Sequence, residues 1–173
     1  VLDYLEGRGL TRQTIKDFHL GYALREWEGL TGELRRKKLD LELAARGGLL
    51  RGKGSQKYYD YFRGRLIFPI FDNHGRILGF GGRVIGSGEP KYLNSPETPL
   101  FNKSRILFAL YQALPHIRKE KEALLVEGYM DAILLHQHGI KIAVAPLGTS
   151  LTEQQIALLR GRVERITLTF DAD

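Results

Sequence analysis

Residues 122–131 read EALLVEGYMD, residues 140–147 read IKIAVAPL, and residues 165–173 read RITLTFDAD. Each stretch contains a short apolar run of the kind that forms a buried strand. Helical patterns over Tyr129 to His138 and over Ser150 to Arg160 separate the three runs. Strands and helices that alternate in this way predict an α/β fold with a parallel βαβαβ sheet.

The expected strands cover Ala123 to Val126, Ile140 to Ala145 and Ile166 to Phe170. Ser150 is followed three residues later by Glu153, which is the spacing of a capping box. We therefore expect the second helix to begin at Ser150.

The residues before this alternation predict a separate α+β part. Two strand-like runs, Leu66 to Phe71 and Ile77 to Phe80, flank the turn sequence DNHG and predict a hairpin. Pro69 lacks a backbone donor, which favours an edge or bulged strand. The remaining elements are expected as follows: helices over residues 12–18, capped by Thr11, over 33–46 and over 104–113, and a loop over 86–99. The charge run KEKE at 119–122 is the expected boundary between domains 1–119 and 120–173.

The composition is that of a folded protein, because 43% of the 173 residues are hydrophobic and 27% are charged. The chain has no cysteine, which excludes disulfides, thiolate zinc sites and a cysteine nucleophile within it. Charged residues interrupt the longest apolar runs and no leader pattern opens the chain, so we expect a cytoplasmic protein without membrane spans. The first residue is Val1, so we expect the chain to be a piece of a longer protein.

Positive charge is concentrated in the middle of the chain. Ten basic and four acidic residues lie between Arg51 and Arg105, so this segment holds the whole net charge of +6. Such a local field attracts the phosphates of a nucleic acid or a nucleoside triphosphate. A solvated basic face is equally compatible with the charge alone.

Acidic residues follow the predicted parallel strands. Glu127 and Asp131 come after the first strand, and Asp171 and Asp173 come after the third. Because ligands bind at the carboxyl edge of a parallel sheet, the four side chains predict a site for Mg²⁺, which prefers carboxylate oxygens. Each motif alone also fits a plainer role, since Asp131 favours a helix dipole and the last aspartates could be a solvated chain end.

These residues also resemble a known family. EGYMD at 127–131 and DAD at 171–173 resemble the two acidic motifs of the TOPRIM fold, which primases, topoisomerases and some nucleases share. Longer segments resemble the basic motifs in the RNA-polymerase core of bacterial DnaG-type primases: RGRLIFPI at 63–70, GFGGR at 79–83, PKYLNSPET at 90–98 and FNK at 101–103. The resemblance covers essentially the whole chain, including residues 4–22.

The resemblance implies a DNA-directed RNA polymerase, a primase that makes short RNA primers for replication on single-stranded DNA. It implies Mg²⁺ or Mn²⁺, ribonucleoside triphosphates and an RNA–DNA product. Glu127 would be a metal ligand or general base, Asp171 and Asp173 metal ligands, and Asp131 an acidic partner in catalysis. The residues that match the family's nucleic-acid and triphosphate groove are Arg8, Arg63, Arg65, Arg83, Lys91, Asn94 and Lys103.

Several parts of the family's proteins are absent from this chain. The zinc-binding domain, the domain that docks on the replicative helicase and the later part of the TOPRIM domain are missing. We therefore expect a fragment that ends inside its catalytic domain and has little or no activity alone.

Two other functions remain open from the sequence. A TOPRIM nuclease or topoisomerase would use the same carboxylates to cut phosphodiesters, and a binding module would keep the groove without the chemistry. A dinucleotide-binding loop at 79–82 is less favoured than a tightly packed, bulged strand, because GFGG lies in the predicted hairpin.

Overall fold

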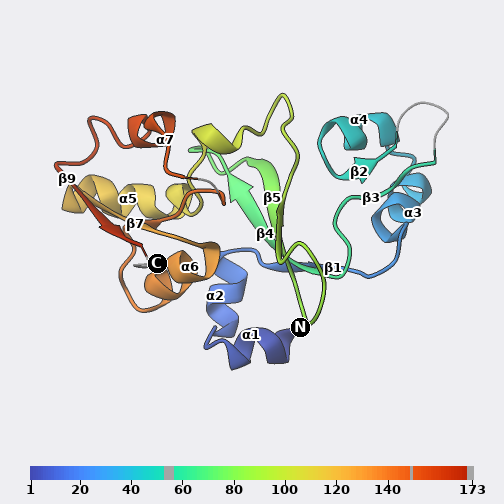
Figure 1. The fold of residues 1–173 in the computed structure, drawn as a ribbon, viewed down its shortest axis with the longest axis horizontal. Coiled ribbons are helices and arrows are strands. Elements are labelled where there is room, and N and C mark those ends of the chain that lie inside the picture. The colour runs from blue at the N-terminus through green and yellow to red at the C-terminus, as the bar shows by residue number, and fades with distance from the viewer. Residues whose placement is uncertain (53–56, 149, 171–173) are drawn as a thin grey trace.

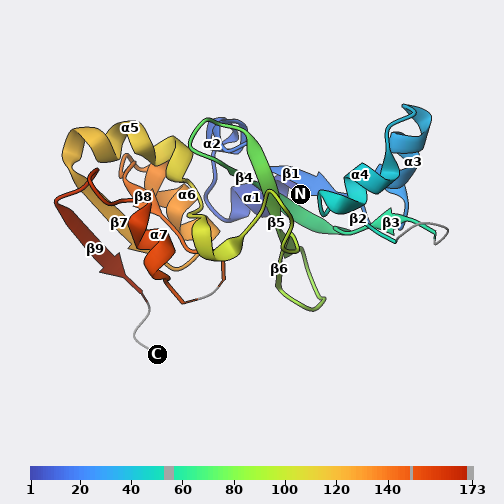
Figure 2. The same ribbon diagram turned by 90° about the horizontal axis from the view of Figure 1, so that it is seen from above.

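The computed structural model describes residues 1–52, 57–148 and 150–170. Its elements are, in chain order, α1 (Leu2–Gly7), α2 (Arg12–Asp17), β1 (Gly21–Ala23), α3 (Gly29–Arg36), α4 (Leu41–Arg46), β2 (Leu50–Arg51), β3 (Tyr59–Asp60), β4 (Arg65–Phe71), β5 (Ile77–Val84), β6 (Tyr92–Asn94), the 3₁₀ turn η1 (Lys103–Arg105), α5 (Leu110–Glu120), β7 (Glu122–Val126), α6 (Tyr129–Gln137), β8 (Ala143–Val144), α7 (Glu153–Ala157) and β9 (Arg165–Thr169). A central antiparallel sheet separates a parallel sheet with its helices from a small unit of α3, α4, β2 and β3 (Figures 1 and 2).

The predicted parallel sheet is confirmed, with the strand order β8-β7-β9. Consecutive residues of β7 belong to two different hydrophobic cores. Leu125 packs in a core with residues of α5, and Val126 packs in another core with residues of α6. Helices therefore cover both faces of β7, which leaves the carboxyl ends of the strands as the open edge.

The predicted hairpin is also confirmed as β4 and β5, within the antiparallel order β1-β4-β5-β6. Leu66, Phe68 and Ile70 alternate along β4 and are fully buried, so one face of this sheet supplies the main core. Of the two predicted forms, an edge strand or a bulged strand, the first is wrong, because β1 pairs on the other side of β4. The pairing with β1 ends at Ile67, so Pro69 pairs with β5 alone, opposite Phe80. The register with β5 shifts between Ile70 and Phe71, which agrees with the bulged form of the prediction.

The single helix predicted over 33–46 is two helices, α3 and α4. Lys38 adopts a left-handed conformation with φ of 56°, which ends α3. Asp40 then caps α4 by accepting hydrogen bonds from the backbone amides of Glu42 and Leu43, at 2.8 and 3.1 Å. The composition of this stretch predicts helix throughout, and local backbone chemistry breaks it.

Three further predictions about helices and loops are wrong. The expected loop over 86–99 contains β6, because pairing with β5 forms a strand there. The expected helix over 104–113 begins only at Leu110, because Phe108 makes a bridge to Ala145 instead. The helix expected from Ser150 begins at Glu153. Its capping box is formed by Thr152 and Gln155 rather than by Ser150 and Glu153.

A buried carboxylate stabilises the small unit at the far end of the molecule. Asp60 of β3 accepts hydrogen bonds from the backbone amides of Leu30 and Thr31, at 2.7 and 2.8 Å, and from the Thr31 hydroxyl at 2.7 Å. It therefore satisfies amides at the start of α3 from a distant strand. Across the described residues, none of the helices is long and apolar enough to span a bilayer.

Candidate functional site

The open edge of the parallel sheet holds two of the predicted acidic residues. Glu127 directly follows β7, and Asp131 lies in the first turn of α6, where its Oδ2 accepts a hydrogen bond from the Gly128 amide at 3.1 Å. Both side chains are exposed and line one cavity of about 290 Å³. The sequence therefore placed Glu127 and Asp131 correctly at a shared edge.

The cavity is formed by both parts of the chain. Tyr92 and Asn94 of β6 line it opposite the two carboxylates, together with Pro146 and Gly148 after β8. A second cavity of about 540 Å³ shares Glu127, Pro146 and Gly148 with the first and extends to Phe170. Glu127 thus lies where two recesses meet.

Asp171 and Asp173 lie outside the described residues. The strand before them, β9, pairs with β7 up to Thr169 opposite Val126, which is the residue before Glu127. Within the described part of the chain, no three carboxylate or histidine side chains gather to hold a metal ion. The donor set that is present, Glu127 and Asp131, fits Mg²⁺ or Mn²⁺, because such ions take one or two protein carboxylates and complete their shell with water and phosphate.

A cation between two aromatic rings lies beside this cavity. The Arg83 side chain is 6% exposed, donates a hydrogen bond to the Tyr92 hydroxyl at 2.8 Å, and has its guanidinium carbon 5.2 Å from the Tyr92 ring centre and 5.8 Å from that of Tyr4. Arg8 lies on the same Tyr4 ring at 5.6 Å. Burial raises the pKa of Tyr92, while the charge of Arg83 lowers that pKa and the charge of Asp131 raises it. Arg83 and Asp131 therefore act electrostatically on the same phenol.

Arg65 is a second buried cation on the antiparallel sheet. It is 7% exposed and donates a hydrogen bond to the Pro90 carbonyl at 2.8 Å. Burial, followed by the charge of Arg63, lowers its pKa. Among the described residues, neither Arg65 nor Arg83 forms an ion pair with a carboxylate. The charge of Glu89 acts on Arg65 without forming an ion pair with it. Buried cations outside ion pairs favour the binding of an anion such as phosphate.

The other predicted groove residues are spread along the chain. Lys91 is exposed just before β6. The Arg63 guanidinium lies 4.0 Å from the ring centre of Trp27, which is 63% exposed, in the small unit. Lys103 lies in η1, where the buried Gln155 of α7 donates a hydrogen bond to its carbonyl at 3.0 Å. The structure thus brings Arg83 close to the carboxylate cavity, while Arg63 and Lys103 have their contacts elsewhere.

Asn94 differs from the other predicted binding residues, because its side-chain atoms already have protein partners. Its Oδ1 accepts a hydrogen bond from the Tyr129 hydroxyl at 2.5 Å, and its Nδ2 donates to the Leu147 carbonyl at 3.0 Å. Burial raises the pKa of Tyr129. Sequence reasoning did not identify Tyr4, Tyr92 or Tyr129 as part of the site. Aromatic residues next to basic ones, as at Lys91 and Tyr92, are the signal that could have indicated such contacts.

The GFGG segment at 79–82 is a closely packed part of β5. A Cβ at Gly79 would lie 2.6 Å from the Phe101 ring, and one at Gly81 would lie 2.6 Å from the Tyr129 ring. These glycines let aromatic side chains approach the backbone. The interpretation as a packed strand is therefore confirmed.

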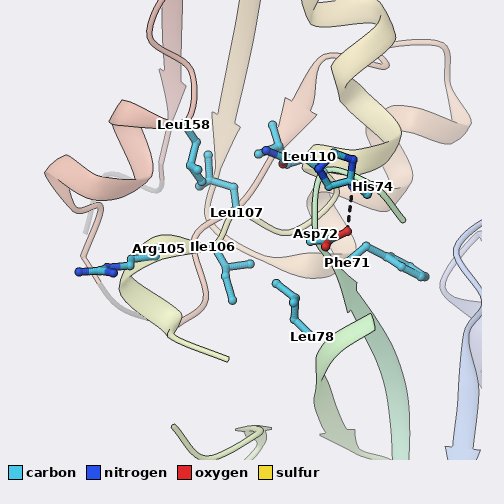
Figure 3. Close-up of a pocket in the computed structure, with 10 residues that line it drawn as sticks. Phe71, Asp72, His74, Leu78, Arg105, Ile106, Leu107, Leu110 and Leu158 are labelled. Carbon is cyan, nitrogen blue, oxygen red and sulfur yellow. Dashed lines mark hydrogen bonds between the residues drawn. The ribbon is translucent and has the colours of Figure 1, made fainter. Parts of the chain in front are cut away.

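A smaller recess of about 180 Å³ lies at the hairpin turn, and Figure 3 shows its lining. Leu78, Ile106 and Leu107 form much of it, and the Arg105 side chain extends away from them (Figure 3). Its carboxylate, Asp72, accepts hydrogen bonds from the backbone amides of Arg76 and His74 and from the Arg76 side chain, which lower its pKa to about 2. The carboxylate in this recess therefore stabilises the hairpin turn through its hydrogen bonds.

Comparison with known proteins matches both parts of the chain. Residues 1–114 match the model of the DNA primase catalytic core, N-terminal domain, and residues 121–173 match that of the Toprim domain. The DNA primase of Halalkalibacterium halodurans is 47% identical over 171 residues, which are 98% of this chain and 28% of that protein. The chain therefore spans between a quarter and a third of this curated relative.

Solved structures agree with these matches. A DNA primase domain from Pseudomonas aeruginosa has a TM-score of 0.91 and 46% identity, over 99% of this chain and 54% of that one. A structure described as the DnaG primase catalytic domain bound to ssDNA has a TM-score of 0.88 and 42% identity, over 99% of this chain and 53% of that one. With the antiparallel sheet, the parallel sheet and the acidic edge in place, the chain belongs to the DnaG-type DNA primase catalytic-core family, of which it contains N-terminal-domain and Toprim sequence.

Proposed function

We propose that the protein is a primase, which joins ribonucleoside triphosphates into short RNA primers on a single-stranded DNA template. The observation that carries this proposal is the cavity that Glu127 and Asp131 share with Tyr92, whose hydroxyl accepts a hydrogen bond from Arg83. Nucleotidyl transfer needs carboxylates for metal ions beside cations for phosphates. Two carboxylates line this cavity, and the cation Arg83 is hydrogen-bonded to Tyr92, one of its lining residues, which supports the proposal.

Each side chain has a role that its surroundings support. Glu127, exposed where two recesses meet, is a metal ligand or accepts the proton of the attacking 3′-hydroxyl, and Asp131 is its acidic partner. Asp171 and Asp173, which lie outside the described residues, are proposed as further metal ligands from their sequence motif alone. A bound Mg²⁺ or Mn²⁺ neutralises phosphate charge and lowers the pKa of the attacking hydroxyl. Arg83, whose guanidinium is hydrogen-bonded to the Tyr92 that lines the cavity, binds triphosphate oxygens.

We propose that the template follows the basic side chains of the 1–119 domain, with the 120–173 domain supplying the carboxylates. Arg8, Arg65, Lys91 and Lys103 contact phosphates along the way. At the far end, Arg63 and Trp27 present a cation and a largely exposed ring, the two kinds of group on which single strands stack. The ssDNA-bound relative supports this proposal. The RNA–DNA product leaves from the same groove. We propose that zinc binding and contact with the replicative helicase are functions of other domains of the full-length protein.

Binding of single-stranded DNA tests the groove. The dissociation constant of a fluorescent oligonucleotide is measured at several salt concentrations for the unsubstituted chain, for Lys91→Ala and for Lys119→Ala, a matched exposed lysine at the end of α5. We expect Lys91→Ala to weaken binding and to reduce the salt slope by about one, and Lys119→Ala to change neither. Binding that does not depend on salt contradicts the groove. Strand cleavage that Glu127→Gln abolishes would favour the TOPRIM nuclease instead.

A further inference from the structure

Asn94 connects the two walls of the carboxylate cavity. It belongs to β6, whereas both partners of its side chain, Tyr129 and Leu147, lie in the Toprim region. Its amide can form few further hydrogen bonds, because Oδ1 accepts from the Tyr129 hydroxyl and Nδ2 donates to the Leu147 carbonyl. Its main-chain carbonyl accepts a hydrogen bond from the Tyr61 hydroxyl at 3.1 Å, which fixes it further.

Tyr129 is well placed to transmit this connection to the acids. It lies two residues after Glu127 and two before Asp131, at the first position of α6. Its side chain is 4% exposed, and its ring centre lies 4.6 Å from that of Phe108 and 5.2 Å from that of Phe68. A ring held so closely moves only together with the start of its helix.

Leu147 transmits the connection to the other recess wall. It is 1% exposed and stands between Pro146 and Gly148, which line both cavities around Glu127. A hydrogen bond to its carbonyl therefore fixes the loop after β8 relative to β6. One amide side chain thus spans the start of α6, the β8 loop and the strand that carries Tyr92.

We propose that Asn94 is a positioning residue that acts through the Tyr129 hydroxyl and holds Glu127 and Asp131 at a fixed place opposite Arg83, rather than a residue that binds template or triphosphate. This inference rests on the proposed primase function and assigns Asn94 a role different from the one that its sequence motif predicts. Loss of either hydrogen-bonding group displaces the carboxylates and leaves the phosphate-binding cations in place.

A double-mutant cycle tests the proposal in the full-length protein. Asn94→Ala, Tyr129→Phe and the double variant are compared for kcat and for KM of ribonucleotide in primer synthesis, and for affinity toward single-stranded DNA. We expect each single variant to lower kcat about tenfold, the effect of one buried hydrogen bond, with KM and DNA affinity unchanged. The double variant should be no slower than the slower single variant, because both changes remove the same interaction.

Matched variants remove the same groups elsewhere. Tyr111→Phe removes the hydroxyl of a partly exposed tyrosine of α5, and Asn73→Ala removes an exposed amide in the hairpin turn. We expect neither control variant to change kcat. Urea unfolding of every variant confirms that it is folded under the assay conditions, and Asn94→Asp, which keeps the acceptor for Tyr129, should retain more activity than Asn94→Ala.

The outcomes separate this inference from the proposed function. Losses in kcat that multiply in the double variant, or a loss of DNA affinity or a raised KM in Asn94→Ala that Tyr129→Phe does not share, would overturn the positioning role and favour direct binding. Absence of primer synthesis by the unsubstituted full-length protein would instead refute the proposed function itself.

Discussion

The packing of Tyr129 against β5 allows a quantitative prediction for Gly81→Ala. The new Cβ would lie 2.6 Å from Cε2 and 2.9 Å from Cζ of the Tyr129 ring. Both distances fall well short of the ~3.5–4.0 Å at which carbon atoms attract one another. The ring cannot move away, because Phe108 and Phe68 pack against it at centre distances of 4.6 and 5.2 Å.

Overpacking of this kind costs about 1–3 kcal/mol. If the urea dependence stays near ~2 kcal/mol/M, a loss of ~2 kcal/mol lowers the midpoint of urea unfolding by about 1 M. Far-UV circular dichroism of the chain in urea measures it. Because Tyr129 begins α6, we also expect lower primer synthesis by the full-length variant.

Gly21→Ala is the matched control. Gly21 also lies in a strand of the antiparallel sheet, β1, but no atom lies within 4 Å of its added Cβ. We expect its midpoint to stay equal or to rise slightly, because alanine restricts the unfolded chain more than glycine does. A Gly81→Ala midpoint equal to that of the unsubstituted chain would refute the packing argument.

Two further predictions concern stability. Asp60→Ala removes the acceptor of three hydrogen bonds at the start of α3, and we expect the free energy of unfolding in urea to fall by about 1–3 kcal/mol. The second prediction concerns His136, which is buried and whose Nε2–H donates a hydrogen bond to the Ala143 carbonyl at 2.8 Å. Burial lowers the pKa of His136, so protonation of its ring favours the unfolded state. The stability it contributes is complete above the unfolded pKa of about 6.5 and is lost as the pH falls from there through the lowered folded pKa, so His136→Gln should reduce the fall in stability between about pH 7.5 and 5.5.

Each of these variants has an exposed counterpart. Asp17→Ala removes an exposed carboxylate that accepts a hydrogen bond from the exposed Gln13, and it should change the free energy of unfolding by less than about 0.5 kcal/mol. His138→Gln, at the exposed end of α6, should keep the pH dependence of the unsubstituted chain. Equal losses for Asp60→Ala and Asp17→Ala, or an unchanged pH dependence in His136→Gln, would contradict the reasoning.

Local patterns predict the elements that local sequence determines. The hairpin of β4 and β5 follows from strand-like runs around DNHG, and the βαβαβ order follows from apolar runs alternating with helical ones. Elements that depend on partners are not visible in such patterns. Pairing with β5 forms β6 in a stretch rich in glycine and proline, and the left-handed Lys38 breaks a segment that favours helix by composition.

The candidate site divides in the same way. The place of Glu127 and Asp131 follows from topology alone, because residues after parallel strands reach one edge. Other features of the site depend on contacts between residues far apart in the chain. One is the place of Arg83 between the rings of Tyr4 and Tyr92. Another is the pair of hydrogen bonds that the Asn94 side chain forms with Tyr129 and Leu147. Residue type and spacing do not encode those contacts.

We infer that Glu127, the carboxylate that follows β7, is required for nucleotidyl transfer by the full-length protein. The most direct test is RNA primer synthesis on a single-stranded template by the full-length protein with Glu127→Gln. The matched control is Glu122→Gln, at the opposite end of β7, where Glu122 pairs with Arg165 at 2.6 Å. We predict that Glu127→Gln lowers synthesis at least ~100-fold without loss of DNA affinity, while Glu122→Gln stays active. Full synthesis by the Glu127→Gln protein would show that Glu127 is not required for nucleotidyl transfer.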